Sequence, residues 1–465
     1  MSTVRRAAAF AVVGSIALVV PLLEAVATAG LAPLAVAAPF ALIAAAAVFG
    51  VHEGRLFELF ARPGERRERR LYGLIGFTLA ASGLVLLAVV SSMPMGVGVG
   101  VVLLVAYGNL AARTVQAAVE DVDPALPTAA FATAGGTAFG AGHLLTRYLE
   151  SGAADGVPAV VFLAAVGGLV AALLRTVLFE SDDPVVMVTV GLWLWLLTTL
   201  AADVTLRGVA IALAVSVGLG YASYALETAS IPGMLAGVSM GIVTIVLGDV
   251  AWFAVLIAFF VVGGLSTKFC YEEKLDRGVA EPDEGARGAA NVLANGAVPL
   301  AAVLAYAAAE TVVIGDAMPS TVLPVSRTLF LFVFVGGVST AMSDTLSSEI
   351  GGVFDGVRLI TTLDPVDPGT DGGVSLPGVA AGIAGAGLVG GVVYALFRGQ
   401  TATGIAVGPT GVGVVVVAGV LGMLVDSLLG ATVEGRLLGN GGVNLLATLS
   451  GGLTAGLAAV ALGLA

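Results

Sequence analysis

The sequence predicts an all-α integral membrane protein, a polytopic transmembrane bundle of about fifteen helices. Of its 465 residues, 58% are hydrophobic and 11% are charged, whereas soluble domains carry about 25% charged residues. The apolar runs reach about 20 residues, the length that crosses a bilayer as a helix, and they are too long for the strands of a membrane barrel. The 65 glycines favour close packing between such helices.

The first helix is expected to remain in the protein. Arg5 and Arg6 precede an apolar run interrupted only by Glu24. A signal peptide is the alternative, but the run is long and no small-residue cleavage site is followed by a soluble domain. Hydropathy places the predicted helices at 7–28, 33–50, 72–91, 95–117, 127–147, 157–178, 185–203, 207–226, 230–247, 250–267, 289–310, 325–343, 375–397, 409–430 and 443–464.

The basic loops predict an orientation. If the N-terminus lies in the cytoplasm and the helices alternate, the two loops richest in arginine and lysine, 51–71 and 268–288, are both cytoplasmic. This arrangement obeys the positive-inside rule. We therefore expect a multi-pass protein of the cell (plasma) membrane, with its polar loops in the cytoplasm.

Charge and residue usage exclude several functions. Twenty basic against 32 acidic residues give a net charge of −12, which argues against a nucleic-acid partner and suggests a salt-accumulating, halophilic cytoplasm. Cys270 is the single cysteine, and His52 and His143 have no partner at ligand spacing, so a disulfide, a thiolate cluster and a histidine zinc site are not expected. No P-loop motif is present, and the glycine-rich stretch 385–390 reads as helix packing rather than dinucleotide binding.

The composition changes near residue 230. Residues 1–229 are expected to form an N-terminal transmembrane region that carries no assignment. Residues 230–465 hold both lysines and most of the polar groups inside apolar segments. Candidate chemistry is therefore expected in the second region, in four polar segments.

The first polar segment, 339–351, reads STAMSDTLSSEIG and ends an apolar helix. A carboxylate at the bilayer centre costs about 2.5–3.5 kcal/mol on insertion scales, so it usually has a partner or an ion. Asp344 and Ser348 share a helix face at i,i+4 spacing, and Thr345 and Glu349 add further oxygens. A polar helix end at the water interface is the alternative interpretation.

The second polar segment, 359–378, contains three prolines and several glycines, which predicts a turn-rich loop. Backbone amides in such turns form concave anion sites. A structural connector is the alternative, although loops of this length tend to be functional. The candidate phosphate-binding residues here are Thr361, Thr362, Gly369, Asp371, Gly373 and Ser375.

The third and fourth polar segments are 425–444 and 266–296. In the former, Asp426 and Ser427 lie inside an apolar run, and Asn440 and Asn444 follow; Asn444 could instead cap the last helix. In segment 266–296, the basic residues could instead serve only as a positive-inside topology signal. That interpretation does not explain asparagines in a membrane helix. The candidates in this segment are Lys268 and Lys274, with Arg287, Asn291 and Asn295 at four-residue spacing on one face.

Together the four polar segments predict a site for a phosphorylated substrate at the cytoplasmic interface. Carboxylates beside hydroxyls suit Mg²⁺, which binds one or two carboxylates and keeps phosphates or waters as other ligands. Basic side chains and a glycine-rich loop suit phosphate oxygens.

The second region resembles the integral membrane family known as domain of unknown function 92, or transmembrane protein 19-like. The resemblance is carried by FFVVGGLSTKF at 259–269, GARGAANVLANG at 285–296, STAMSDTLSSEIG at 339–351, PGTDGGVSLPG at 368–378, VDSLLGATVEG at 425–435 and GNGGVN at 439–444. The motifs are ordered and cover about half of the chain. One departure is Glu434, where relatives are expected to carry glutamine.

Plant chloroplast members of this family act as phytyl-phosphate kinases that use a nucleoside triphosphate. The resemblance therefore implies a prenyl-phosphate kinase with a nucleoside triphosphate as phosphoryl donor and a membrane lipid or prenyl substrate. It implies Asp344, Glu349 and Asp426 as catalytic residues. The metal ligands that it implies for Mg²⁺ are Asp344, Glu349, Asp371 and Asp426. A transporter, or a membrane protein without catalytic activity, is the alternative. The prenyl chain, the nucleotide and the oligomeric state are left open by the sequence.

Overall fold

The computed structural model describes residues 2–28, 30–179, 182–200, 204–278, 287–311, 326–399 and 404–465. These residues form two compact units, Met1–Ala210 and Ile211–Ala465. The boundary lies inside a helix, α11 (Leu206–Ala225), whereas the sequence predicted a boundary between residues 229 and 230, just after that helix.

The first unit is a helical bundle whose centre is α7 (Met95–Ala118). This helix packs against α1, α6, α8, α9 and α10. Its contact with α8 is close, because a Cβ at Gly135 would lie 2.8 Å from the carbonyl oxygen of Leu104. The remaining elements are α1 (Ser2–Ser15), η1 (Ile16–Val19), α2 (Val20–Val26), α3 (Ala32–Phe49), α4 (Gly54–Phe60), α5 (Glu65–Glu68), α6 (Tyr72–Val90), α8 (Ala125–Ser151), α9 (Val157–Val177) and α10 (Asp183–Leu200).

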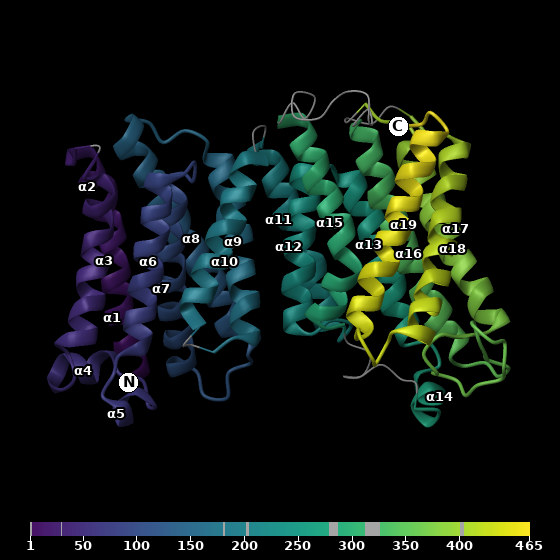
Figure 1. Ribbon diagram of the computed structural model, residues 1–465, viewed down its shortest axis with the longest axis horizontal. Helices are drawn as coiled ribbons and strands as arrows, with labels where there is room; N and C mark the ends of the chain where they lie inside the picture. The colour runs from purple at the N-terminus through teal and green to yellow at the C-terminus, as the bar shows by residue number, and fades with distance from the viewer. Residues whose placement is uncertain are drawn as a thin grey trace. The chain divides into compact units, whose positions relative to one another are not determined.

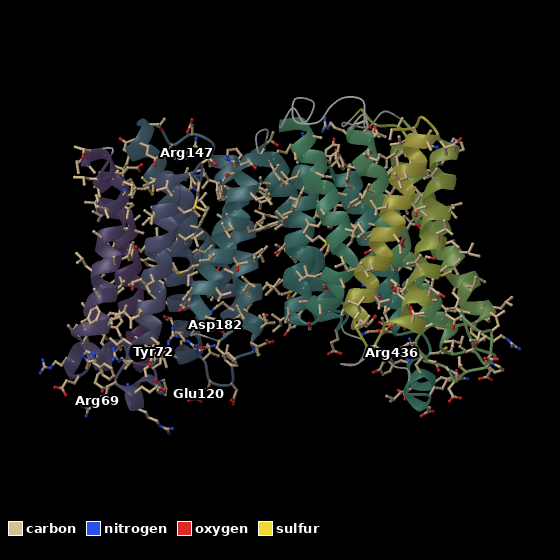
Figure 2. The ribbon with its side chains drawn as sticks, viewed as in Figure 1. Arg69, Tyr72, Glu120, Arg147, Asp182 and Arg436 are labelled. Carbon is tan, nitrogen blue, oxygen red and sulfur yellow. The ribbon has the colours of Figure 1, made fainter. Side chains whose placement is uncertain are left out.

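Charged side chains of the first unit gather at the ends of its helices. Figure 2 shows Arg69, Glu120 and Asp182 at one end of this bundle and Arg147 at the other. Between these ends the outer helices present large apolar side chains, including Leu34 and Leu42, each 68% exposed. Such a surface is suited to lipid rather than water.

The second unit is built around α16 (Arg327–Gly351), which packs against α13, α15, α17, α18 and α19 (Figure 1). Close approach needs glycine on the neighbouring helices, because a Cβ at Gly422 or Gly451 would collide with Thr340 of α16. The other elements are α12 (Ile231–Leu247), α13 (Val250–Thr267), α14 (Tyr271–Asp276), α15 (Ala289–Thr311), β1 (Arg358–Leu359), β2 (Gly373–Val374), α17 (Leu376–Phe397), α18 (Pro409–Thr432) and α19 (Asn440–Ala461).

The predicted fold class is confirmed. Within the described residues, 13 helices are long and apolar enough to cross a membrane. Two further helices were also predicted as crossings: α12, which is apolar and slightly shorter, and α8, which has 27 residues. The largest error concerns α16, which continues to Gly351 instead of ending at residue 343. Its polar segment stays helical because polar side chains there find hydrogen-bond partners on neighbouring helices. The Ser343 hydroxyl, for example, donates to the Gly382 carbonyl of α17 at 2.8 Å.

Candidate functional site: an acidic cavity at one end of the second unit

A cavity of about 300 Å³ lies where four helices of the second unit meet the loop between α16 and α17. It lies beside the last turns of α16 and α18 and the first residues of α17 and α19. Its polar lining consists of Asp344, Ser347, Ser348, Thr370, Asp371, Ser375, Asp426, Ser427, Glu434 and Asn440.

Helical spacing brings one face of α16 to this cavity. Asp344, Ser347, Ser348 and Gly351 line it, and their spacing of three, four and seven residues places them on the same side of a helix. Asp344 lies in the last two turns of α16, and Asp426 occupies the corresponding position near the end of α18. The two carboxylates therefore lie at the same end of the bundle.

The side chains of Asp344 and Asp426 lie within hydrogen-bonding reach of each other. The Oδ1 atom of Asp426 is buried and accepts no hydrogen bond from the described residues. Two carboxylates at this separation repel unless a proton or a cation lies between them. A buried acceptor without a donor, next to a second carboxylate, is the arrangement that a cation would satisfy.

Two further carboxylates, Asp371 and Glu434, complete the acidic lining. Glu434 follows the end of α18, outside the membrane-spanning segment. Burial, and then the charge of Asp371, raises the pKa of the Glu434 carboxyl above its ordinary value. The cavity thus carries four carboxylates, and no lysine or arginine belongs to its described lining.

The loop between α16 and α17 is held against α18 by a glycine. Gly372 has a φ of +75°, and a Cβ there would lie 2.5 Å from the Ala431 nitrogen and 2.6 Å from the Ser427 carbonyl oxygen. The short hairpin of β1 and β2 fixes the loop, with Ile360 N–H donating to the Gly372 carbonyl at 3.0 Å. Backbone thus forms part of the cavity wall where a side chain would not fit.

Two helices begin at the cavity. Ser375 is the N-cap of α17, and its hydroxyl accepts from Gly378 N–H at 3.2 Å. Asn440 is the first residue of α19, whose preceding residue, Gly439, supplies no side-chain cap. Helix N-termini carry partial positive charge and exposed amide donors, so both favour an anion in the cavity.

The structure brings together nine of the predicted site residues. They come from three of the four polar segments, so those segments do converge on one place. These residues are Asp344, Ser348, Gly369, Asp371, Gly373, Ser375, Asp426, Ser427 and Asn440.

Glu349, predicted as a catalytic residue and metal ligand, lies elsewhere. Its Oε2 atom accepts from Lys274 Nζ at 2.6 Å, and Lys274 also donates to the carbonyls of Ser266 and Thr267. Five helical residues separate it from Asp344, which turns the two side chains about 140° apart around the axis. The pair therefore links α14 to α16 instead of lining the cavity, and Lys274 is likewise not available there for phosphate.

The other predicted cations are also used outside the cavity. Lys268 donates to the Leu226 carbonyl at 2.9 Å. Arg287 is buried, with its guanidinium 5.0 Å from the Phe259 ring centroid, and it lines a separate, mostly apolar cavity of about 80 Å³. A phosphate in the acidic cavity would therefore have to be neutralised by something other than these side chains.

The remaining predicted residues also lie outside the cavity lining. Asn295 donates to the Asn291 carbonyl at 3.1 Å on its own helix. Thr361 and Thr362 are exposed on the loop. Thr345 and Asn444 are buried in α16 and α19.

Three polar side chains of the cavity lining were not among the predicted site residues: Ser347, Thr370 and Glu434. Ser347 stands three residues after Asp344, a spacing that would have identified it had the helix been extended to Gly351. Glu434 and Thr370 reach the cavity through loop geometry, for which the sequence carries no periodic signal. Within the described residues, no three Asp, Glu, His or Cys side chains are close enough to hold a metal ion by themselves, so the four predicted carboxylate ligands do not form one cluster.

Comparison with known proteins relates the second unit to a family. The sequence model described as Integral membrane protein DUF92 matches residues 214–452. MJ0933 of Methanocaldococcus jannaschii, described as an uncharacterized membrane protein, is 34% identical over 224 residues, 48% of this chain and 82% of the relative. No solved structure matches this chain.

Two shorter matches come from photosynthetic organisms. The uncharacterized membrane protein sll0875 of Synechocystis is 36% identical over 140 residues, 28% of this chain and 49% of the relative. Protein VTE6, chloroplastic, of Arabidopsis thaliana is 34% identical over 148 residues, 32% of this chain and 41% of the relative. This chain therefore covers less than half the length of either protein.

Proposed function

Because this chain belongs to the DUF92 family of integral membrane proteins, we propose that it is a prenyl-phosphate kinase whose site is the acidic cavity. It transfers the terminal phosphoryl group of a nucleoside triphosphate to an isoprenyl monophosphate. The resemblance to phytyl-phosphate kinases among plant members, together with the match to a chloroplastic relative, supports this reaction class.

The observation that carries the proposal is the pairing of Asp344 with Asp426 in a cavity without basic side chains in its described lining. Four carboxylates would repel a phosphate unless cations lie between them. Mg²⁺ fits this lining, because it uses one or two carboxylates and leaves positions for phosphate oxygens. Asp344 and Asp426 would hold it, and when bound it neutralises negative charge on the transferring phosphates.

The residues of this chain position the two substrates. The first turns of α17 and α19 present amide donors to phosphate oxygens. The hydroxyls of Ser348, Thr370 and Ser427 donate to backbone carbonyls, so they offer neutral oxygens to a bound cation. The acceptor oxygen of a prenyl monophosphate is largely ionised at neutral pH, because the second pKa of a phosphate monoester is about 6. It therefore needs no general base, which agrees with the absence of histidine from the described cavity lining.

In the reaction, an acceptor phosphate oxygen forms a bond to the terminal phosphorus of the nucleotide. The bond between that phosphorus and its bridging oxygen breaks, and a nucleoside diphosphate leaves. Positioning and charge stabilisation suffice for such a transfer.

Apolar side chains beside the cavity support an acceptor that resides in the membrane. Leu376 adjoins Ser375 and is 88% exposed, Leu437 is 81% exposed, and Leu428 adjoins Ser427 and is 47% exposed. A prenyl chain in the lipid could lie along these side chains while its phosphate enters the cavity. The positive-inside pattern of the sequence supports placing this end of the unit at the cytoplasmic face, where nucleotides are available.

A substrate carrier is supported less well. Carriers bind their substrate near the membrane midplane, between interrupted helices. Asp344 and Asp426 instead belong to continuous helices and lie near their ends.

The test is phosphoryl transfer by the purified full-length protein. We expect radiolabel to pass from a γ-labelled nucleoside triphosphate to a prenyl monophosphate in the presence of Mg²⁺, across a panel of nucleotides and chain lengths. Asp426→Asn should abolish transfer. Asp355→Asn is the matched control, since the Asp355 side chain is 91% exposed and pairs with Arg277 outside the cavity. A monodisperse protein that transfers no label with any pair would contradict the proposal.

A further inference from the structure

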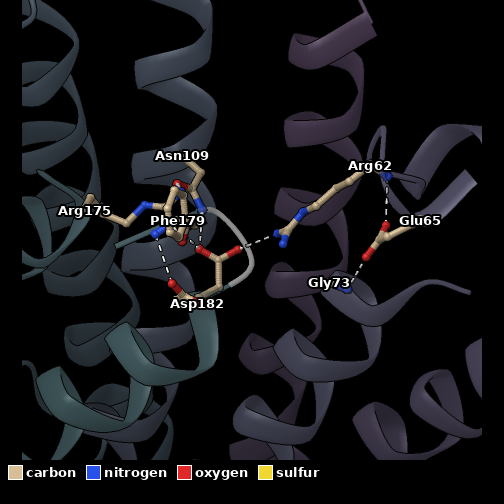
Figure 3. Close-up of polar contacts among 8 residues, drawn as sticks. Arg62, Glu65, Gly73, Asn109, Arg175, Phe179 and Asp182 are labelled. Carbon is tan, nitrogen blue, oxygen red and sulfur yellow. Dashed lines mark hydrogen bonds and ion pairs between the residues drawn. The ribbon is translucent and has the colours of Figure 1, made fainter. Parts of the chain in front are cut away.

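Largely buried guanidinium groups have different surroundings in the two units. In the first unit, Arg62 and Arg175 each pair with Asp183 at 3.2 Å, and Figure 3 shows the two arginines reaching this place from separate elements. In the second unit, Arg287 lines the mostly apolar cavity of about 80 Å³, and no carboxylate belongs to the described lining of that cavity. This second setting combines a cation with space for hydrocarbon.

The apolar cavity runs along three helices, the later part of α11, the first half of α12 and the middle of α13. Ser216 and Ser223 of α11 both line it, and seven helical residues span about 10 Å. Phe253 and Phe260 line it over the same length of α13. The cavity is half-open, and Leu219 of its lining is 38% exposed. Because water is absent from the bilayer core, this space suits a hydrocarbon chain that lies along the helices.

The volume of the apolar cavity fits one chain and no headgroup. On the measure that gives about 80 Å³, one water needs about 10–15 Å³. The cavity therefore takes several methylene-sized groups in a row. A phosphate group and its substituents must stay at the end where the helices stop.

Arg287 lies at the end of the cavity where α11 has stopped and α12 begins. Its backbone N–H donates to the Thr228 carbonyl at 3.0 Å, and its carbonyl accepts from Ser230 N–H at 3.2 Å. The guanidinium lies 5.0 Å from the Phe259 ring centroid and against Gly263, where a Cβ would lie 2.7 Å from Nη2. An arginine has five N–H donors, so contacts with its own chain are compatible with binding a ligand oxygen as well. A basic side chain between helices near their ends is a typical site for an anionic lipid headgroup.

A second polar group lies deeper in the apolar cavity. Ser216 is 3% exposed, and its hydroxyl has no hydrogen-bond partner among the described residues. It lies nine residues before the end of α11, whereas Gly263, beside Arg287, lies about one turn from the end of α13. Both helices end on the same side, because a Cβ at Gly264 of α13 would lie 3.8 Å from Cβ of Thr228, just after α11. A buried hydroxyl without a partner is costly, so Ser216 favours a ligand with a neutral oxygen below its charged group.

We propose that this cavity binds a glycerophospholipid with an anionic headgroup, with one of its chains between α11, α12 and α13. Such a lipid carries a phosphate, then neutral ester or ether oxygens, then hydrocarbon. The cavity presents the complementary groups in the same order: the guanidinium of Arg287, the hydroxyl of Ser216 and the apolar side chains around it. A prenyl monophosphate or a fatty acid has no oxygen beyond its charged group. The quaternary ammonium of phosphatidylcholine would lie near a cation, which disfavours it.

The experiment is native mass spectrometry of the full-length protein, released from nanodiscs that contain equal amounts of phosphatidylglycerol and phosphatidylcholine with identical chains. EDTA is present, so that a metal ion at the acidic cavity does not contribute. We expect one lipid retained per protein molecule, with phosphatidylglycerol preferred at least about fivefold, the effect of one basic residue near an anionic headgroup. Geranylgeranyl monophosphate added to the same sample tests whether the acceptor of the proposed reaction competes for this place.

Gly237→Leu tests the binding of the chain. Gly237 lines the cavity, and nothing lies within 4 Å of a Cβ there, so leucine fits the fold but occupies the space of the chain. Retention of phosphatidylglycerol should fall at least about fivefold. Gly218→Leu is the matched control, since Gly218 lies on α11 outside the lining and also has nothing within 4 Å of an added Cβ.

Two further variants test the binding of the polar groups. Arg287→Gln should remove the preference for phosphatidylglycerol over phosphatidylcholine, and Ser216→Ala should weaken retention about threefold. Arg436→Gln is the control, because that arginine is exposed and lies outside the cavity lining. Arg287 is buried, so its variant is compared only as monodisperse protein. The Gly237 variant does not depend on this condition.

Loss of retention in Gly237→Leu, with unchanged retention in Gly218→Leu and in Asp426→Asn of the acidic cavity, would support the proposal. The proposal is wrong if the wild type retains both phospholipids equally or neither of them. It is wrong if monodisperse Gly237→Leu retains phosphatidylglycerol as strongly as the wild type, or if monodisperse Arg287→Gln keeps the preference.

The prenyl probe separates the two possible occupants. If geranylgeranyl monophosphate displaces the phospholipid and Gly237→Leu loses both, the cavity holds the acceptor and the proposal is wrong. None of these measurements depends on phosphoryl transfer, so this proposal and the proposed function can fail separately.

Discussion

Lys274 Nζ lies 2.6 Å from Glu349 Oε2 in an ion pair that is almost completely withdrawn from solvent, with side-chain exposures of 2% and 9%. The pair joins α14, which follows α13, to the last turns of α16. It lies on a different face of α16 from Asp344, so the two acidic residues of this helix have different surroundings.

Breaking this pair should destabilise the second unit. Lys274→Met or Glu349→Leu alone leaves a buried charge without its partner, which costs about 3–5 kcal/mol. The double variant should recover much of that loss, since both charges are gone. Thermal unfolding in detergent measures the effect, and Asp355→Asn, at an exposed pair with Arg277, should stay close to wild type.

The same double variant tests the catalytic role predicted for Glu349. Because Glu349 does not line the acidic cavity, the folded fraction of the double variant should still transfer phosphoryl groups. Loss of phosphoryl transfer in a correctly folded double variant would show that Glu349 is needed for the reaction, as the sequence predicted.

Asp344→Asn and Asp426→Asn should each remove Mg²⁺ binding. In the wild type, Mg²⁺ at about a hundredfold excess over its Kd should stabilise the fold by about 2.7 kcal/mol. In either variant this metal-dependent shift should disappear. Without metal, stability should be equal or higher, because two adjacent carboxylates no longer repel. A preserved metal-dependent rise in Tm in either variant would remove that residue from the proposed site.

The pH dependence of stability should report on Glu434. Its pKa is raised above the ordinary value of 4.5 by burial and by Asp371. A raised pKa in the folded state means that the stability contributed by this group is complete below pH 4.5 and is lost as pH rises through the folded pKa.

Glu434→Gln should therefore match the wild type in Tm below pH 4.5 and exceed it once the pH passes the raised pKa. The comparison is made in EDTA, because a bound cation would favour the ionised form. Asp371→Asn should reduce the difference by removing the second cause. If the Gln variant instead becomes less stable than the wild type as the pH rises, the pKa of Glu434 is not raised in the folded state.

Gly372→Ala should disrupt the cavity wall. A Cβ at this position meets Ala431 and the Ser427 carbonyl, and the φ of +75° adds strain of about 1–2 kcal/mol. Gly356→Ala is the matched control, because its φ is +80° but nothing lies within 4 Å of the added carbon. The Gly372 variant should lose phosphoryl transfer and more stability than the control. Equal losses in the two variants would show that backbone strain alone is responsible.

Labelling of single cysteines tests the predicted orientation. In a Cys270→Ser background, cysteines introduced at the exposed positions Arg67 and Glu272 should react with an impermeant reagent only from the cytoplasmic side. A cysteine at Asp155, in the loop after α8, should react only from the opposite side. Labelling of Arg67 and Glu272 positions from different sides would overturn the topology.

The sequence was sufficient to locate the helices. Apolar runs of about 20 residues form helices in lipid because every backbone group must find its partner within the segment. This requirement is local, so hydropathy found α18 and α19 within a few residues of their ends. It also separated the second region, whose motifs carry the family resemblance, from the first. The prediction ended α16 too early. Hydropathy counts the polar side chains of its last turns but not the neighbouring helices that form hydrogen bonds with them.

Tertiary structure alone decided which polar side chains meet. The rotation of α16 about its axis places Asp344 next to Asp426 and Glu349 next to Lys274. From the sequence, Asp344 and Glu349 had been predicted to belong to one metal site. Tertiary structure also brought Arg62, from a loop that the sequence had marked only as a topology signal, to Arg113 and Asp183 of other helices. Charge pairing depends on how each helix is rotated about its axis and on which helices it contacts. The length of an apolar run determines neither of these.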